Sequence, residues 1–108
     1  MVFDGGVFAA RFENGVLRAL TPAGESEIAG LNGGLFHLEF IQTAPSKGWL
    51  GSWDALERYE FAPREFRLVK NGPLVWEAAA AGSLGPHSAR VTFSVRKGEP
   101  CLRVRVKI

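Results

Sequence analysis

Hydrophobic and polar residues alternate in two segments within the last twenty residues of the chain. The alternation runs through Arg90–Arg96, stops at the turn-type residues Lys97–Pro100, and resumes through Leu102–Ile108. Because successive side chains of a strand point to opposite faces, this two-residue period predicts two β-strands. We expect them to form an antiparallel hairpin in which both strands bury their apolar face.

A second hairpin is predicted near the start of the chain. Two short apolar runs, Val7–Phe12 and Val16–Leu20, are separated by Glu13, Asn14 and Gly15. Asn-Gly between such runs favours a tight hairpin turn, because both residues tolerate positive φ.

Three further segments are expected to be strands. Leu35–Gln42 alternates polar and apolar residues, and Phe66–Lys70 ends at an Asn-Gly-Pro turn. Leu74–Gly82 contains four consecutive alanines with high helix propensity, but its start and its neighbouring turns favour a strand. We therefore expect a four-stranded antiparallel meander over Phe66–Ile108. The chain as a whole, residues 1–108, is predicted to be one all-β domain, an antiparallel β-sandwich.

Length and composition are those of an ordinary soluble globular domain. The chain has 108 residues, of which 46% are hydrophobic and 22% charged. No apolar run approaches the roughly 18 residues of a membrane span, and no signal peptide precedes the first strand. A single cysteine, Cys101, favours a reducing, cytoplasmic location and is expected to be a packing residue. Because the pattern is still that of a strand at Ile108, we expect the sequence to be a piece of a longer protein.

Positive charge is concentrated at the C-terminal end. The net charge is +2, but residues 89–108 hold six basic residues and one acid. Arg103, Arg105 and Lys107 fall on one face of the last predicted strand. A nucleic-acid partner would fit this charge, but no aromatic residue interleaves with the stripe. A solvated face, or one that packs on an acidic neighbouring domain, is the preferred interpretation, and we predict no nucleic-acid partner.

Residues 43–61 form the least regular stretch of the pattern and hold the candidate binding chemistry. Residues 49–61 contain two tryptophans, a tyrosine and four charged side chains. Aromatic rings can stack on the C–H faces of sugars while carboxylates accept hydrogen bonds from sugar hydroxyls. Trp49, Trp53 and Asp54 are therefore the candidate carbohydrate-binding residues. The alternative is that Trp49 and Trp53 close one end of the sandwich as buried plugs.

Catalytic and metal-binding chemistry is not predicted for this chain. Asp54, Glu57 and Glu60 have no spacing that fixes an acid/base pair. His37 is expected to be exposed on a strand, and His87 to lie in a loop. Neither histidine has a cysteine or a second histidine at metal-ligand spacing, so we predict no zinc site and no other cofactor in this chain.

Four segments resemble a known family when they are taken in order. They are ENGVLRAL (13–20), GSWDALERYEF (51–61), RLVKNGPLVWEA (67–78) and SARVTFSVRKGEPCLRVRVKI (88–108). Together they resemble the β-sandwich region that follows the catalytic domain in family-38 glycoside hydrolases, the α-mannosidases. Leu56 stands where the family has its second tryptophan.

The resemblance implies a galactose-mutarotase-like supersandwich without catalytic residues of its own. The family's zinc and its aspartate nucleophile belong to the preceding catalytic domain. The expected partners are that domain of the parent chain and a mannose-containing carbohydrate. The alternative is a free-standing interaction module that associates through an exposed strand edge, including with copies of itself.

Overall fold

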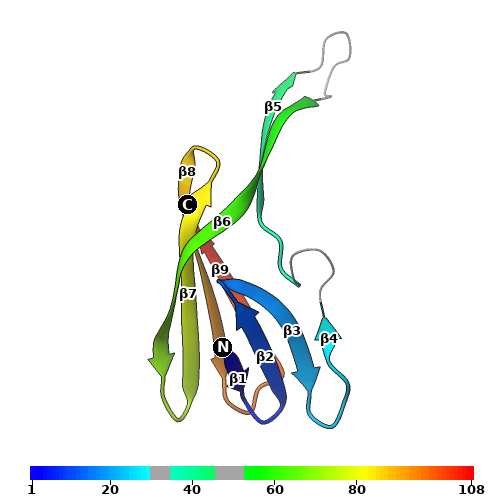
Figure 1. Cartoon of the computed structure of the whole chain (residues 1–108), viewed down its shortest axis with the longest axis vertical. Helices are drawn as coiled ribbons and strands as arrows, with labels where there is room; N and C mark the ends of the chain where they lie inside the picture. Colours follow the sequence, from blue (N-terminus) through cyan, green and yellow to red (C-terminus); the bar gives the residue numbers. More distant parts are fainter. Residues whose placement is uncertain (30–34, 46–52) are drawn as a thin grey trace.

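The chain folds into two antiparallel β-sheets with no helix among the described residues (Figure 1). The computed structural model describes the backbone of residues 1–29, 35–45 and 53–108, and the side chains of residues 1–29, 35–42 and 57–108. No helix in that part of the chain could span a membrane. The first sheet has the order β1 (Val2–Asp4), β2 (Phe8–Glu13), β3 (Val16–Pro22) and β4 (Ile28–Ala29). The second has the order β5 (Glu39–Pro45), β6 (Trp53–Asn71), β7 (Val75–Leu84), β8 (His87–Arg96) and β9 (Arg103–Lys107).

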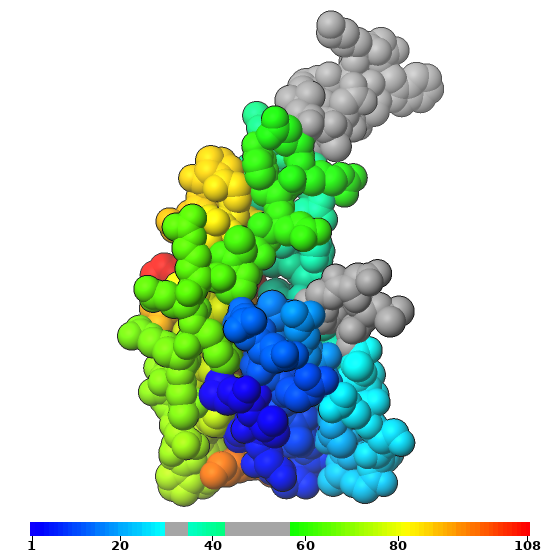
Figure 2. All heavy atoms as spheres, viewed as in Figure 1, coloured from blue at the N-terminus to red at the C-terminus, as the bar shows by residue number. Residues whose placement is uncertain are grey.

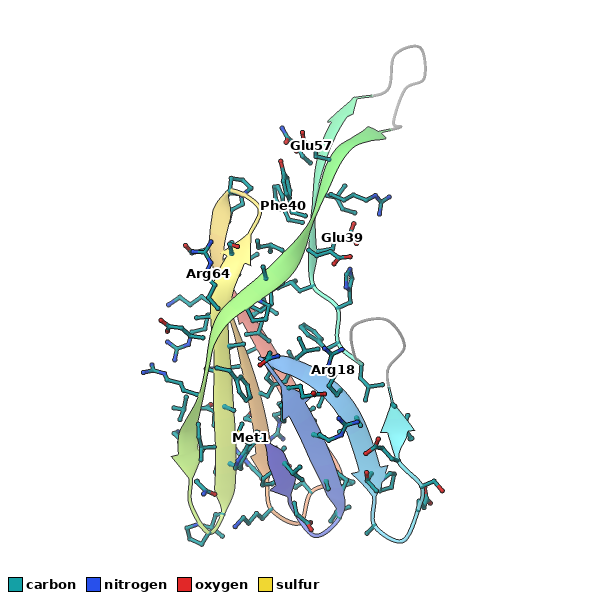
Figure 3. The ribbon with its side chains drawn as sticks, viewed as in Figure 1. Met1, Arg18, Glu39, Phe40, Glu57 and Arg64 are labelled. Atoms are coloured by element: carbon teal, nitrogen blue, oxygen red, sulfur yellow. The ribbon has the colours of Figure 1, made fainter. Side chains whose placement is uncertain are left out.

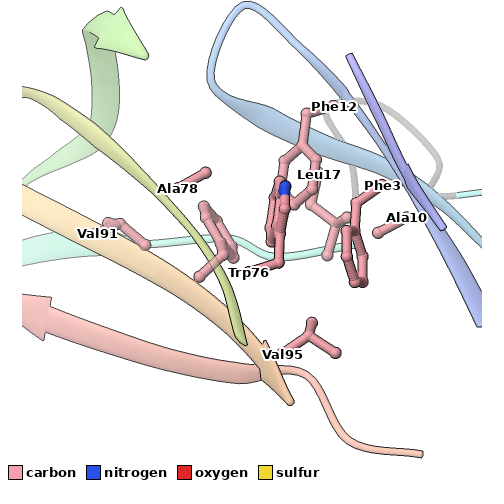
Figure 4. Close-up of a cluster of buried hydrophobic side chains, with 9 residues drawn as sticks. Phe3, Ala10, Phe12, Leu17, Trp76, Ala78, Val91 and Val95 are labelled. Carbon is pink, nitrogen blue, oxygen red and sulfur yellow. The ribbon is translucent and has the colours of Figure 1, made fainter. Parts of the chain in front are cut away.

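The two sheets pack face to face through an aromatic core, which confirms the predicted all-β sandwich (Figure 4). Phe12 of β2 lies at its centre and is 1% exposed. Its ring is 5.1 Å from Phe93, 5.3 Å from Phe66 and 5.5 Å from Trp76, all on the second sheet. Phe3 of β1 stacks on Trp76 at 4.6 Å. Burial of these large rings supplies the main force that holds the sheets together.

The predicted N-terminal hairpin is confirmed. Strands β2 and β3 pair in antiparallel register and are joined at Asn14 and Gly15, with φ values of 50° and 79°. Both values lie in the left-handed region that asparagine and glycine adopt most readily, so the local sequence selects this turn.

The predicted C-terminal meander is also confirmed, and the alanine run lies in strand β7. Ala78 and Ala80 are fully buried on the inner face, where strands β6 and β8 flank them. Gly82 of the same strand lies against the backbone of β6. A Cβ atom at this position would stand 2.0 Å from the carbonyl oxygen of Ala62, so no larger residue fits without a backbone shift.

The expectation that β9 buries its apolar face is wrong. Val104 and Val106 share the inner side of the sheet with their partners Phe93 and Val91, as the alternation requires. However, they are 39% and 38% exposed, and Ile108 is 69% exposed. Strand β9 is the last strand of its sheet, and these two valines keep more than a third of their surface exposed.

Several predicted boundaries are also corrected. Most of the stretch expected to be irregular, residues 43–61, is strand, because β5 continues to Pro45 and β6 begins at Trp53. Strand β5 starts at Glu39, four residues later than predicted. His87 opens strand β8 and does not lie in a loop. Cross-strand pairing thus extends β5 at its C-terminal end, β6 at its N-terminal end and β8 at His87 beyond the local pattern, whereas residues 35–38 lie outside any strand.

The molecule is elongated, with principal extents of 56 × 27 × 21 Å. The length arises because β5 and the first part of β6 leave the two-sheet body as a two-stranded ribbon (Figures 1 and 2). We call this ribbon, residues 39–45 and 53–60, the hairpin arm.

Candidate functional site

The hairpin arm is a regular antiparallel ladder. Its register runs from Glu39 opposite Glu60 to Pro45 opposite Trp53, with one irregularity between Gln42 and Thr43. At its base, the amide of Phe61 donates a hydrogen bond to the carbonyl of Leu38 at 2.9 Å. A two-stranded ribbon is only marginally stable alone in water. The arm therefore depends on side-chain contacts near its base for its position.

Those contacts form an aromatic cluster of Phe40, Tyr59 and His87. Phe40 and Tyr59 are opposite residues of the ladder, and their rings stack with centroids 6.1 Å apart. The His87 ring, at the start of β8, and the Phe40 ring meet edge to face, with their centroids 5.0 Å apart. The Tyr59 ring also covers the turn between β7 and β8, where a Cβ at Gly85 would lie 2.6 Å from it. The aromatic cluster thus anchors the arm while Phe40 and Tyr59 remain half-buried and accessible.

A carboxylate accompanies the aromatic cluster. The hydroxyl of Tyr59 donates a hydrogen bond to the carboxylate of Glu57, which is exposed two residues along the same strand (Figure 3). This hydrogen bond, with a smaller effect of burial, raises the pKa of the Tyr59 phenol above its ordinary value. Tyr59 is therefore a neutral phenol at physiological pH, with its proton directed at Glu57.

The opposite face of the arm carries an ion-pair cluster around Glu39. Its carboxylate contacts the His37 ring at 3.2 Å and the Arg58 guanidinium at 3.1 Å. The hydrogen bond with His37, and then the interactions with Arg58, hold the pKa of Glu39 below its ordinary value. His37 is exposed, as predicted. The two faces of the arm therefore differ: one is aromatic with a carboxylate, and the other is ionic.

Two of the candidate residues from the sequence, Trp53 and Asp54, belong to the outer part of the arm. The backbone of Trp53 pairs with Pro45, and that of Asp54 pairs with Ala44. Their side chains, and Trp49 altogether, lie outside the described part of the structure. The alternatives of sugar contact and buried plug for the two tryptophans thus both remain predictions.

Sequence reasoning missed Phe40, Tyr59 and His87 as a group. They come from three strands, and only the register of β5 against β6 places Phe40 beside Tyr59. Two features of the sequence point to members of this group. The alternation places Phe40 on the apolar face of its strand, and Tyr59 lies in the aromatic-rich stretch. His87 carried no signal, because it was assigned to a loop.

The chemistry of this site is that of binding. Half-buried aromatic rings offer a flat apolar surface, and Glu57 offers acceptors for hydroxyl groups. Within residues 1–29, 35–45 and 53–108, no three His, Cys, Asp or Glu side chains converge where they could hold a metal ion. Comparison of the chain with protein-family models, curated proteins and solved structures finds no match.

Proposed function

We propose that this chain is a non-catalytic β-sandwich module of an α-mannosidase-like glycoside hydrolase, and that its hairpin arm contacts carbohydrate beside the catalytic domain. The observation that carries the proposal is the aromatic cluster on the arm, with Glu57 next to Tyr59. The order of the four sequence segments that resemble the α-mannosidase sandwich supports the choice of family.

The arrangement of the arm supports a role at a boundary with another domain. The aromatic cluster lies on the arm and at its base, where strands β5 and β6 leave the body (Figure 1). The Trp53-Asp54 segment lies further out along the same arm. A ribbon that projects in this way presents both of its faces to a neighbouring molecule.

Carbohydrate is the ligand class that fits the aromatic face best. A pyranose ring can lie on the exposed part of Phe40 or Tyr59 and direct its hydroxyls at the free oxygen of Glu57. Such a site is expected to bind weakly, because the surface is open and offers few hydrogen bonds.

The carbohydrate proposal can be tested by titrating the protein with a mannose oligosaccharide and following amide chemical shifts. Resonances of residues near Phe40 and Tyr59 should move, and Tyr59→Ala and Trp53→Ala should each weaken the response. Arg67→Ala, on the outer face of β6, is the matched control and should leave it unchanged. An equal response in all four proteins would refute contact through the arm.

The family proposal has a separate test, which is the coding sequence on either side of this segment. An upstream domain with a His-x-Asp pair and an Asp-Trp pair shortly after Ile108 would support it. Flanking sequence that encodes an unrelated domain would contradict it, whatever the sugar titration gives.

The exposed apolar residues of β9 favour a second candidate, an interaction module that associates through this strand edge. The free edge of β9 can pair with a further strand, as in β-augmentation, and a layer that the partner packs over the inner face would cover Val104 and Val106. Pairing of β9 with a second β9 would bring basic side chains together, so charge favours a different partner strand. Sedimentation velocity at increasing protein concentration tests self-association: a constant sedimentation coefficient would agree with the charge argument and leave a different partner strand, whereas a rising coefficient would contradict that argument.

A further inference from the structure

The outer face of the second sheet, turned away from the core, has an unfavourable arrangement of charge. The register aligns Glu65, Ala81, Arg90 and Lys107 in one row across strands β6 to β9. Arg90 and Lys107 are therefore directly opposite each other on neighbouring strands. Like charges in this position destabilise a sheet. The row thus places two cations together at some cost to stability.

These cations are not neutralised by the described part of the protein. Arg103, at the start of β9, pairs with Glu99 at 3.4 Å. In contrast, no carboxylate of a described residue lies within ion-pair distance of Arg90, Arg105 or Lys107. The unpaired cations are therefore available to a ligand.

Two of these cations, Arg90 and Lys107, line a hollow in the surface. Its volume is about 460 Å³, and its lining includes Ala81 and Gly82, which have small side chains. Arg90 and Lys107 line it together with Arg64. Arg64 is the extra residue of a β-bulge in β6, a feature that redirects a side chain, and Figure 3 shows it away from the first sheet.

Polar groups complete the lining of the hollow. Ser83 and Ser88 bring hydroxyl donors, and Glu65 is the one carboxylate among the lining residues. A smaller hollow of about 250 Å³ shares Arg90 and Lys107 with it, and adds Arg105 and one carboxylate, Glu77. The three basic residues of the larger hollow thus outnumber its single acid.

We propose that this hollow binds a phosphate or sulfate group, held between Arg90 and Lys107 and contacted by Arg64. An arginine matches two oxygens of such a group with its planar fork, and a lysine adds a compact charge. The bound anion would replace the repulsion across the row with attraction to both strands. This site is separate from the hairpin arm and does not depend on the proposed function.

The test is thermal unfolding in phosphate, compared with chloride at equal ionic strength so that general screening is the same. Phosphate should raise the unfolding midpoint in a saturable way, because a ligand of the folded state stabilises it. Lys107→Glu should raise the midpoint without phosphate, since it places opposite charges across the row, and should abolish the phosphate effect. A higher midpoint without phosphate, combined with the loss of the phosphate effect, distinguishes an anion site from a residue that merely supports the fold.

Two further variants complete the experiment. Lys97→Glu, in the turn between β8 and β9, makes the same charge change elsewhere and should keep the full phosphate response. Arg90→Ala should weaken phosphate binding roughly ten- to hundredfold, the effect of losing one hydrogen bond between charged groups. Absence of a phosphate effect in the parent protein, or equal losses in Lys97→Glu and Lys107→Glu, would overturn the proposal.

The source of the anion is distinguished by three ligands. Tenfold tighter binding of a hexose phosphate than of inorganic phosphate would assign the site to a phosphorylated sugar. Equal affinity would assign it to the free anion, and both results support the site. If the unphosphorylated hexose stabilised the protein as much as the hexose phosphate does, that result would contradict the proposed anion site.

Discussion

Replacement of Phe12 by alanine should remove the central contact between the two sheets. Its ring is 1% exposed and lies within 5.5 Å of the ring centroids of Phe66, Trp76 and Phe93. Truncation of such a buried phenylalanine typically costs about 3–5 kcal/mol, from lost burial and from the cavity left behind. Small domains have about 5–15 kcal/mol in total, so the variant should be close to unfolding at physiological temperature.

Urea unfolding followed by tryptophan fluorescence, to which the buried Trp76 contributes, measures this loss. The midpoint for Phe12→Ala should fall by about 1–5 M, given a loss of about 3–5 kcal/mol and a slope of about 1–3 kcal/mol per molar urea for small proteins. Leu74→Ala is the matched control, because Leu74 is 75% exposed and its truncation should cost less than about 0.5 kcal/mol.

A double-mutant cycle between Phe12 and Phe93 then isolates the contact itself. The rings meet edge to face at 5.1 Å, and such pairs contribute about 0.5–1.5 kcal/mol beyond their burial. A loss below about 1.5 kcal/mol for Phe12→Ala, well under the usual range for such truncations, together with strictly additive effects in the cycle, would refute the face-to-face packing of the sheets.

Three further predictions concern the backbone and the arm. Gly82→Ala should destabilise by about 1–3 kcal/mol in urea unfolding, as overpacking does, while Gly72→Ala, with its nearest neighbour 3.7 Å away, should be nearly neutral. Asn14→Ala should lower the free energy of unfolding by about 1 kcal/mol, because alanine disfavours the φ of 50°, whereas Asn14→Gly should lower it little. Equal losses of stability in the two variants would contradict the turn assignment. The pKa of Glu39 in the folded protein lies below the ordinary value of a glutamate carboxyl group. The stability that its ion pairs contribute is therefore present above that ordinary value and is lost as the pH falls through the lower, folded-state pKa. Glu39→Gln should therefore unfold at a lower urea concentration than the parent at pH 7 and at a similar concentration at pH 2, and an unchanged difference would exclude this linkage.

Local chemistry made some of the fold predictable from the sequence. The Asn14-Gly15 turn is selected by two residues that accept positive φ, so the hairpin around it needs no information from distant parts of the chain. The alternation in β8 likewise identifies which side chains point inward. It also places Val104 and Val106 on the inner side of β9, but it carries no information on whether a second layer covers them. The face of the sheet on which a side chain lies can be read from the periodicity of the sequence, whereas the burial of that side chain depends on the other sheet.

The candidate site was less predictable, because it depends on register. Phe40 and Tyr59 are nineteen positions apart, and the ladder between β5 and β6 is what places one ring on the other. The mixture of aromatic and charged residues after Trp53 lacks the regular period of a strand. The arm forms because two such segments satisfy each other's backbone hydrogen bonds, which is a property of the pair.

Strand β6 has a mechanical consequence, because it belongs to both the arm and the body. It pairs with β5 up to Glu60 and with β7 from Phe61 onward, without a break in the chain. The hydrogen bonds of an antiparallel ladder lie perpendicular to the strands, so tension along β6 loads many of them in shear at once. A molecule that pulls on the arm along this axis would thus act directly on the ladder between β6 and β7. Because β6 runs unbroken from the arm into the sheet, movement of a neighbour bound to the arm would be transmitted to the body as force.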